Sequence, residues 1–308
     1  MTSFGFLLKS YAPDRDFAGR LIESFHRHNT TGLPLYLLVP ASDVDAFASL
    51  GGDSVTVMSE EPLATHFVTQ RSFGLTEGYL NQQVVKLAFH ELDLLDNYLC
   101  LDSDTVFLRD FTEADFIAPD GYPYTVLVED RELLVEPHYY ATQWVSRMEH
   151  LRRIAELIGY DDPVLRTCHA HQVFSARVLR SFVVDFLEPR GWSYRDALNE
   201  GPYEFSWYNF WLQATEVIPI HQREPLFKMF HHEGQHLEYI LRGVTRDDMA
   251  RAYVGMTIQS NFARHLGTTA ITDSKPKALA PYLSYGELGS LISAKGRDTF
   301  TRRFGRKS

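Results

Sequence analysis

Cysteine is nearly absent from this sequence, and so are long apolar stretches. Cys100 and Cys168 are the only two cysteines in 308 residues, and they lie far apart in the chain. A small scaffold held together by disulfides is therefore excluded. No apolar run approaches the roughly 20 residues that span a bilayer, and residues 4–8 are too few for the core of a signal peptide. These absences predict a globular protein of the cytoplasm.

A general excess of positive charge is also missing. The formal net charge is −10, and no basic stretch with interleaved aromatic residues occurs in the body of the chain. General nucleic-acid binding is therefore not expected. Residues 275–308 nevertheless carry a net charge of +6. We predict one domain over residues 1–274 and a basic tail, which is either a solvated end or a segment that docks on a membrane surface or a partner.

The glycine-rich loops of common nucleotide-binding proteins are missing as well. The apolar run at residues 4–10 is followed by Tyr11, Ala12, Pro13 and Asp14, and no Walker loop occurs. A dinucleotide-binding Rossmann domain and a P-loop enzyme both lose their main support. Strands are predicted at residues 4–10, 35–39, 55–58 and 98–101, with helices at 16–28 and 81–95. This alternation predicts an α/β fold with a mixed, mostly parallel central sheet flanked by helices.

The pattern Asp-x-Asp occurs at residues 14–16, 43–45 and 102–104. The first two pairs open predicted helices, where we expect the carboxylates to cap first-turn amides. Only Asp102 and Asp104 directly end a strand, at the edge where α/β sheets bind ligands. Two carboxylates at this spacing can hold one Mg²⁺ or Mn²⁺ and leave positions open for phosphates, and a turn-forming role is the alternative.

The predicted helix at residues 81–95 has two distinct faces. Its apolar face is formed by Val84, Leu87, Ala88, Leu92 and Leu95. Its polar face is formed by Gln82, Gln83, Lys86, His90 and Asp93. A polar helix face is usually solvated. Because this helix directly precedes the acidic strand end, however, Lys86 could reach a diphosphate.

These motifs resemble bacterial GT-A-type glycosyltransferases, especially a poorly characterised subgroup that makes polysaccharides. The GT-A fold that this resemblance implies is Rossmann-like. The resemblance rests on residues 82–87 running into residues 101–105, then on residues 203–205 and 230–232. It implies an enzyme that moves a sugar from a UDP- or GDP-sugar donor to a glycan or lipid-linked acceptor. A peripheral contact of the basic tail with the inner membrane surface would bring the enzyme to such an acceptor.

The resemblance also implies roles for individual residues. In that family the Asp-x-Asp pair holds the divalent cation that bridges the donor diphosphate. The resemblance therefore places Asp102 and Asp104 at the cation. It also gives Asp104 a catalytic role. Lys86, with Gln82 and Gln83 beside it, would contact the donor. The early strand ends would bind the nucleoside, through Tyr11 and Asp14 and more loosely through Pro40 and Glu60. His231 or His232 would complete the metal site.

A proton acceptor is needed if the transfer inverts the anomeric centre. Glu204 is the candidate, because it lies in an aromatic-rich turn at residues 201–208 that suits sugar faces. The alternative is a capping glutamate before a helix at residues 207–214. His169, His171 and Gln172 could line the acceptor side, or they form local hydrogen bonds.

A different function class is suggested by His232, Glu233 and His236. Their spacing matches the zinc-peptidase pattern, in which two histidines lie one helical turn apart and a glutamate activates water. Gly234 weakens such a helix, and no third ligand stands out, Asp273 being only a candidate. A zinc metallopeptidase and a non-catalytic nucleotide-sugar binder are therefore kept as alternatives to the transferase.

Overall fold

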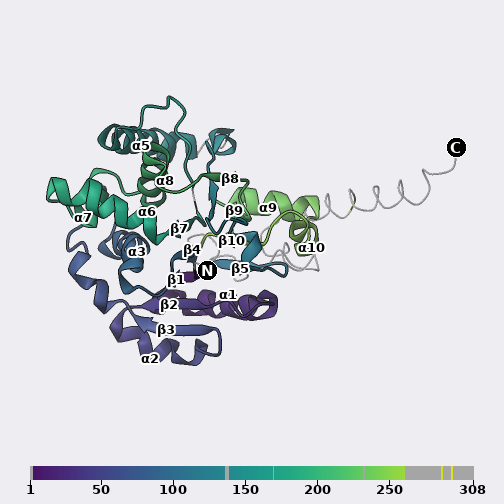
Figure 1. Cartoon of the computed structure of the whole chain (residues 1–308). Helices are drawn as coiled ribbons and strands as arrows, with labels where there is room; N and C mark the ends of the chain where they lie inside the picture. The colour runs from purple at the N-terminus through teal and green to yellow at the C-terminus, as the bar shows by residue number, and fades with distance from the viewer. Residues whose placement is uncertain are drawn as a thin grey trace.

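The computed structural model describes residues 3–135, 139–168, 170–231 and 233–260, with residues 286 and 293. Its main sheet has the strand order β3-β2-β1-β4-β7 (Figure 1). Strands β1 (Phe4–Lys9), β2 (Leu35–Val39), β3 (Val55–Ser59) and β4 (Asn97–Asp102) run parallel, and β7 (Val173–Ser175) is antiparallel to β4. The predicted α/β class with a mixed, mostly parallel sheet is confirmed.

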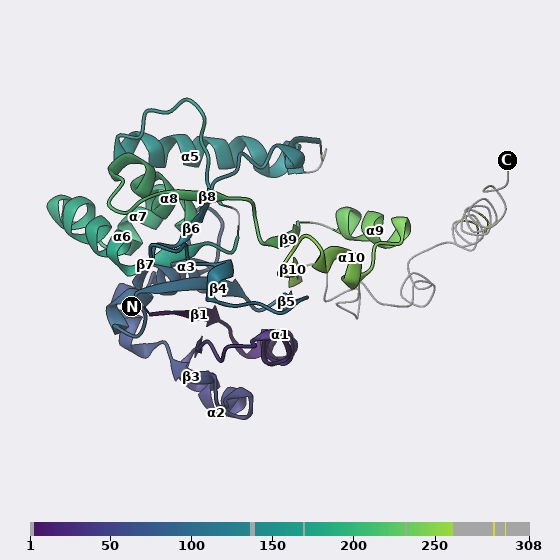
Figure 2. The same ribbon diagram turned by 45° about the vertical axis from the view of Figure 1, so that its right-hand side comes forward.

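Helices cover both faces of this sheet (Figure 2). Side chains alternate along each strand, so Tyr98 and Cys100 of β4 join one core while Leu99 and Leu101 join the other. Helices α1 (Arg15–His28) and α2 (Val44–Phe47) lie on the Leu99 side. The other side is covered by α3 (Glu77–Ala88), α5 (Val145–Ile158), α6 (Ala176–Ser181), α7 (Tyr194–Glu200) and α8 (Glu204–Thr215).

Helix α3 differs from the prediction at both ends. It begins four residues earlier than expected, because the Thr76 side chain accepts a hydrogen bond from the Tyr79 amide and caps the first turn. It ends at Ala88, and a short 3₁₀ turn, Phe89–Leu92, follows before Asp93 adopts a left-handed conformation. Gln83, Lys86 and His90 of the polar face are buried, because α7 and α8 pack against this side, whereas Gln82 is half-buried and Asp93 is exposed.

Shorter elements complete the described chain. They are β5 (Thr105–Phe107), β6 (Tyr124–Val126), β8 (His221–Arg223), β9 (Phe227–Phe230), α9 (Glu233–Arg242), α10 (Arg246–Ala250) and β10 (Gly255–Ile258). Strands β5, β10 and β9 form a second sheet, and β6 pairs with β8. Strand β7 is followed directly by α6 and then by a π-helical turn, Phe182–Leu187.

No helix within the described ranges is long and apolar enough to cross a membrane. The basic tail predicted at residues 275–308 lies outside the described residues, apart from Gly286 and Ser293. Its predicted role therefore stays a prediction.

Candidate active site

Four of the predicted site residues lie at or just after the carboxyl ends of β1 and β4, the two strands between which the strand order reverses. Strand β2 lies on one side of β1 and β4 lies on the other. The order in which strands are added to the sheet therefore reverses between β1 and β4, and this place is the switch point of the sheet. In such sheets the crevice outside the carboxyl strand ends at this point binds ligands. Tyr11 and Asp14 follow β1, while Asp102 ends β4 and Asp104 follows it in a tight turn.

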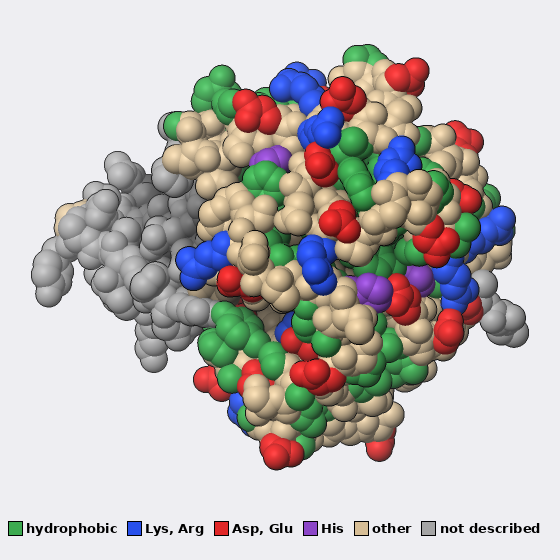
Figure 3. Space-filling model, turned by 90° about the vertical axis from the view of Figure 1, so that its left-hand side faces the viewer, with side chains coloured by type: hydrophobic (Ala, Val, Ile, Leu, Met, Phe, Trp, Pro, Cys, Tyr) green, Lys and Arg blue, Asp and Glu red, His purple; other side chains and the backbone are tan. Residues whose placement is uncertain are grey.

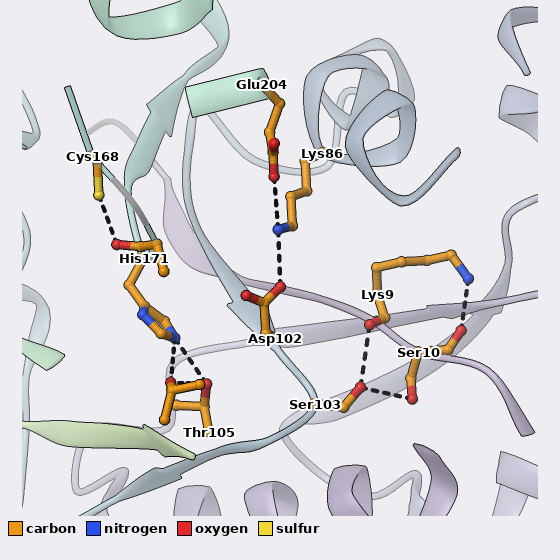
Figure 4. A network of polar contacts seen from close by, with 11 residues as sticks. Lys9, Ser10, Lys86, Asp102, Ser103, Thr105, Cys168, His171 and Glu204 are labelled. Atoms are coloured by element: carbon orange, nitrogen blue, oxygen red, sulfur yellow. Dashed lines mark hydrogen bonds and ion pairs between the residues drawn. The ribbon is translucent and has the colours of Figure 1, made fainter. Parts of the chain in front are cut away.

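Asp102 belongs to a polar cluster whose other members come from two distant segments (Figure 4). It has the same strand parity as Tyr98 and Cys100, so its side chain emerges on the face covered by α3 and α8. There its Oδ1 atom accepts a hydrogen bond from the Lys86 ammonium at 2.9 Å. The same ammonium donates to Glu204 Oε1, also at 2.9 Å. Three residues predicted separately are therefore joined in one ion cluster.

The ion cluster is largely shielded from water at its centre. The Lys86 side chain is 4% exposed and that of Glu204 is 10% exposed, whereas Asp102 is 35% exposed. Burial disfavours charge on Lys86, but the carboxylates of Asp102 and Glu204 hold its pKa well above the usual lysine value. The ammonium also lies 4.8 Å from the centre of the Phe205 ring. Lys86 is thus a fixed positive charge directed at the exposed edge of Asp102.

Glu204 is the first residue of α8, which begins three residues earlier than predicted. Tyr203 is the N-cap and makes no side-chain capping bond. The Glu204 carboxylate forms an ion pair with Lys86 of α3, and the alternative role as a capping residue is not observed.

Asp104 has one satisfied and one unsatisfied carboxylate oxygen. Its Oδ2 accepts the Ser260 amide at 2.6 Å, whereas the buried Oδ1 has no hydrogen-bond partner among the described residues. Burial, with a further contribution from the Asp102 charge, raises the pKa of Asp104 to about 7. Two neighbouring carboxylates, one with a free oxygen, fit a divalent cation whose remaining ligands come from phosphates and water.

The residues expected to bind the donor differ in their surroundings. Tyr11 is exposed, and the charge of Asp14 contributes to the raised pKa of Asp104, so Asp14 lies close to the acidic turn. Gln82 is half-buried. Gln83 is buried, and neither atom of its amide has a hydrogen-bond partner within the described part of the chain.

The expected capping by the other acidic pairs is wrong in its details. Asp14 makes no side-chain capping bond to α1, and Asp43 makes none to α2. Instead, Asp43 Oδ2 accepts a hydrogen bond from the Ala12 amide at 2.6 Å. This contact joins the ends of β1 and β2, because both loops lie at the same edge of the sheet.

Of the two histidines predicted at the metal site, the structure describes only His231. His231 follows β9, and β10 lies between β9 and the turn that holds Asp104. His232 lies outside the described residues. Helix α9 begins at Glu233, so of the two peptidase-pattern histidines only His236 belongs to the described helix. Within the described ranges, no group of three or more His, Cys, Asp and Glu side chains is arranged to hold a metal ion.

Local hydrogen bonds account for His171 and Gln172. His171 Nε2 lies 2.8 Å from Thr105 Oγ1, and burial lowers the pKa of His171 to about 4. Gln172 Oε1 accepts the Val126 amide. Both side chains therefore make buried hydrogen bonds with residues distant in the sequence, and His169 lies outside the described residues.

Comparison with known proteins gives a family for this chain. Residues 9–238 match the family described as "Family of unknown function (DUF6492)". The chain belongs to this family. No protein of curated function matches the sequence.

The DUF6492 chain is also similar to the crystal structure of mouse xyloside xylosyltransferase 1 in its apo form. The TM-score is 0.48 at 13% sequence identity, over 85% of this chain and 99% of the mouse chain. At this identity and score, nothing about the substrate follows from the likeness.

Two neighbours of the site were not predicted as a pair. Lys9, the last residue of β1, forms an ion pair with Glu60 at 2.8 Å, and it lies opposite Asp102 in the strand register. Ser103 donates to Ser10 and ties the acidic turn to the end of β1. The parity of β1 places Lys9 on the face of Leu7, a signal that the sequence contains. The ion pair between Lys9 and Glu60 could be found only once the strand order was known.

Proposed function

We propose that this protein is a metal-dependent glycosyltransferase of the GT-A type, which moves a sugar from a nucleotide-sugar donor to a glycan or lipid-linked acceptor. The observation that carries the proposal is the ion cluster Asp102, Lys86 and Glu204 beside the unsatisfied Oδ1 of Asp104, at the switch point of the sheet. Polysaccharide synthesis in the cytoplasm is the setting that the sequence resemblance suggests.

The chemistry of sugar transfer fits these groups. A nucleoside diphosphate leaves during the transfer, and a bound Mn²⁺ or Mg²⁺ would neutralise its developing charge. Asp102 and Asp104 would hold that cation, with His231 or His232 as a further ligand. Lys86 would exchange its contact with Asp102 for a donor phosphate oxygen. Tyr11, Asp14, Gln82 and Gln83 would contact the rest of the donor.

Glu204 would then accept the proton of the acceptor hydroxyl in an inverting transfer. In the structure the Glu204 Oε1 atom is occupied by the Lys86 ammonium at 2.9 Å. A shift of Lys86 toward the diphosphate would weaken this pair. Binding of the donor and activation of the base would therefore be coupled through one ammonium group.

Nucleotide-dependent thermal stabilisation tests the proposal. UDP or GDP with Mn²⁺ should raise the melting temperature, since a ligand at 100 times its Kd stabilises the folded state by about 2.7 kcal/mol. Asp104→Asn should abolish the Mn²⁺-dependent increase and keep the fold, because the asparagine carbonyl can still accept the Ser260 amide.

Asp53→Asn, at an exposed turn, is the matched control and should respond like the wild type. A wild-type response of the Asp104→Asn protein would overturn the metal assignment. Stoichiometric zinc in the purified protein, together with no response to either nucleotide, would instead favour the peptidase alternative.

A further inference from the structure

A row of aromatic side chains leads from the surface to the N-terminus of α8. The Phe73 ring is edge-on to His150, with centroids 4.5 Å apart, and His150 lies 5.9 Å from Tyr203. Phe73 is exposed, His150 and Tyr203 are half-buried, and the next residue, Glu204, is buried. We call Phe73, His150 and Tyr203 the aromatic row.

Phe73 is held in an unfavourable backbone conformation. It has φ of 54°, and the following Gly74 has φ of 74°, within a tight turn closed by the Leu75 amide and the Ser72 carbonyl. Such turns normally place Asn, Asp or Gly at this position, and a bulky residue there is an outlier. The turn nevertheless presents a phenyl ring that is 47% exposed. Strain of this kind is typical of ligand-binding positions.

A buried ion pair lies beside the row. Arg147, in the first turn of α5, donates from Nη2 to Asp130 Oδ2 at 2.7 Å and is 4% exposed. Its Nε and the hydroxyl of Tyr139 are buried and have no hydrogen-bond partner among the described residues. Burial raises the pKa of Tyr139 to about 12; the Arg147 charge opposes this shift, and Asp130 and Tyr203 add to it, so these four groups are close neighbours.

The aromatic row and this ion pair connect to the ion cluster through Tyr79. The Tyr79 side chain is 45% exposed, and the charges of Glu204, Lys86 and Asp102 act on its hydroxyl. Tyr79 and Lys86 are seven residues apart on α3 and therefore share one helix face. Polar and aromatic groups thus continue from Phe73 to the proposed base.

We propose that the aromatic row, Arg147, Asp130 and Tyr139 form the acceptor subsite, and that it binds a neutral sugar ring of a glycan. Aromatic rings pack against the C–H face of a sugar. The unsatisfied Arg147 Nε and Tyr139 hydroxyl can hydrogen-bond its hydroxyl groups. Asp130 already neutralises the guanidinium, so a carboxylate or phosphate gains little there. This inference rests on the proposed function, which it extends to the acceptor.

Saturation-transfer NMR on the full chain with UDP and Mn²⁺ tests the inference. The probes are the methyl glycosides of glucose, galactose, mannose and xylose, with methyl glucuronide as the acidic probe. At least one neutral glycoside should bind more tightly than the glucuronide.

Tyr139→Phe removes only the hydroxyl and should weaken that binding about twofold to tenfold, the effect of one hydrogen bond. Phe73→Asn should weaken it at least as much while leaving the melting temperature equal or higher, because asparagine tolerates the left-handed conformation. Tyr122→Phe, whose hydroxyl accepts a long hydrogen bond of 3.4 Å from Arg177, is the matched control and should leave binding unchanged.

The proposal is overturned if no neutral glycoside binds, if the glucuronide binds best, or if both variants bind the glycosides like the wild type. Nucleotide binding is recorded in the same samples. Parallel samples contain GDP in place of UDP. A bound nucleotide without any bound glycoside removes the subsite alone, whereas bound glycoside in a protein that binds neither UDP nor GDP removes the proposed transferase and keeps a sugar-binding surface.

Discussion

Lys86 shows how strongly one buried charge constrains its surroundings. Its ammonium lies 2.9 Å from a carboxylate oxygen of Asp102 and 2.9 Å from one of Glu204. Removing one partner of a buried ion pair commonly costs about 3–5 kcal/mol, because the other charge stays buried without compensation. Substitutions at this cluster should therefore preserve hydrogen bonding if they are to report on chemistry rather than on folding.

Glu204→Gln meets that requirement. The amide oxygen can still accept a hydrogen bond from Lys86, but the side chain cannot take a proton from an acceptor. We expect donor binding to survive while turnover falls by about 10²-fold to 10⁴-fold in a nucleotide-sugar transfer assay. Glu200→Gln, which replaces a surface partner of Arg153, is the control and should keep its turnover. Near-normal turnover of the Glu204 variant with retained anomeric configuration would refute both the base and the inverting mechanism.

At the scale of elements, the 3₁₀ turn that follows α3 makes a second buried polar contact, with α7. His90 Nε2 lies 2.9 Å from the Tyr194 hydroxyl, which itself donates to Glu91 Oε1 at 2.8 Å. Since the hydroxyl hydrogen is used on Glu91, the imidazole must carry its proton on Nε2. The buried Nδ1 has no partner among the described residues, so protonation there would create a charge without an acceptor.

This contact predicts a pH-dependent stability. Burial lowers the pKa of His90 to about 4, although Glu91 opposes the shift. An unfolded histidine titrates near 6.5, so the unfolded state binds more protons between these values and stability falls as the pH decreases from about 6.5 to about 4. The His90 share is on the order of 3 kcal/mol.

Urea denaturation across this pH range measures the effect. His90→Gln should flatten the dependence, whereas His26→Gln, at an exposed position of α1, should not. An unchanged slope in the His90 variant would show that its proton is not bound differently in the two states. His171 and His236, whose pKa values are also lowered to about 4 by burial, would maintain part of the slope.

At the scale of the whole molecule, charge is mixed over the described surface shown in Figure 3, where acidic and basic side chains alternate without a large patch of one sign. The +6 charge of residues 275–308 contrasts with this pattern. We expect the full chain to pellet with anionic vesicles at low salt, because each basic residue near an anionic surface contributes about 1 kcal/mol of binding free energy. A chain lacking residues 275–308 should remain in solution. Equal pelleting of both would rule out a membrane role for the tail.

Several features of this protein could be derived from its sequence alone. The apolar runs and their spacing predicted β2 at its observed boundaries and the parallel character of the sheet, since buried strands joined by helices have few other arrangements. The position of Asp102 at a strand end, and the parity that turns it toward α3, also follow from period-two alternation. Helix ends were predicted less well, because the Thr76 cap and the left-handed Asp93 are weak local signals.

The tertiary structure decided which distant residues meet. Lys86 and Glu204 are 118 positions apart and Lys9 and Glu60 are 51 apart, so no local pattern pairs them. The strand order brought β1 beside β4, and the packing of α8 on α3 placed Lys86 in a buried ion cluster. Sequence periodicity is local and determines which face a side chain takes, whereas the contact made on that face depends on elements that arrive from elsewhere in the chain.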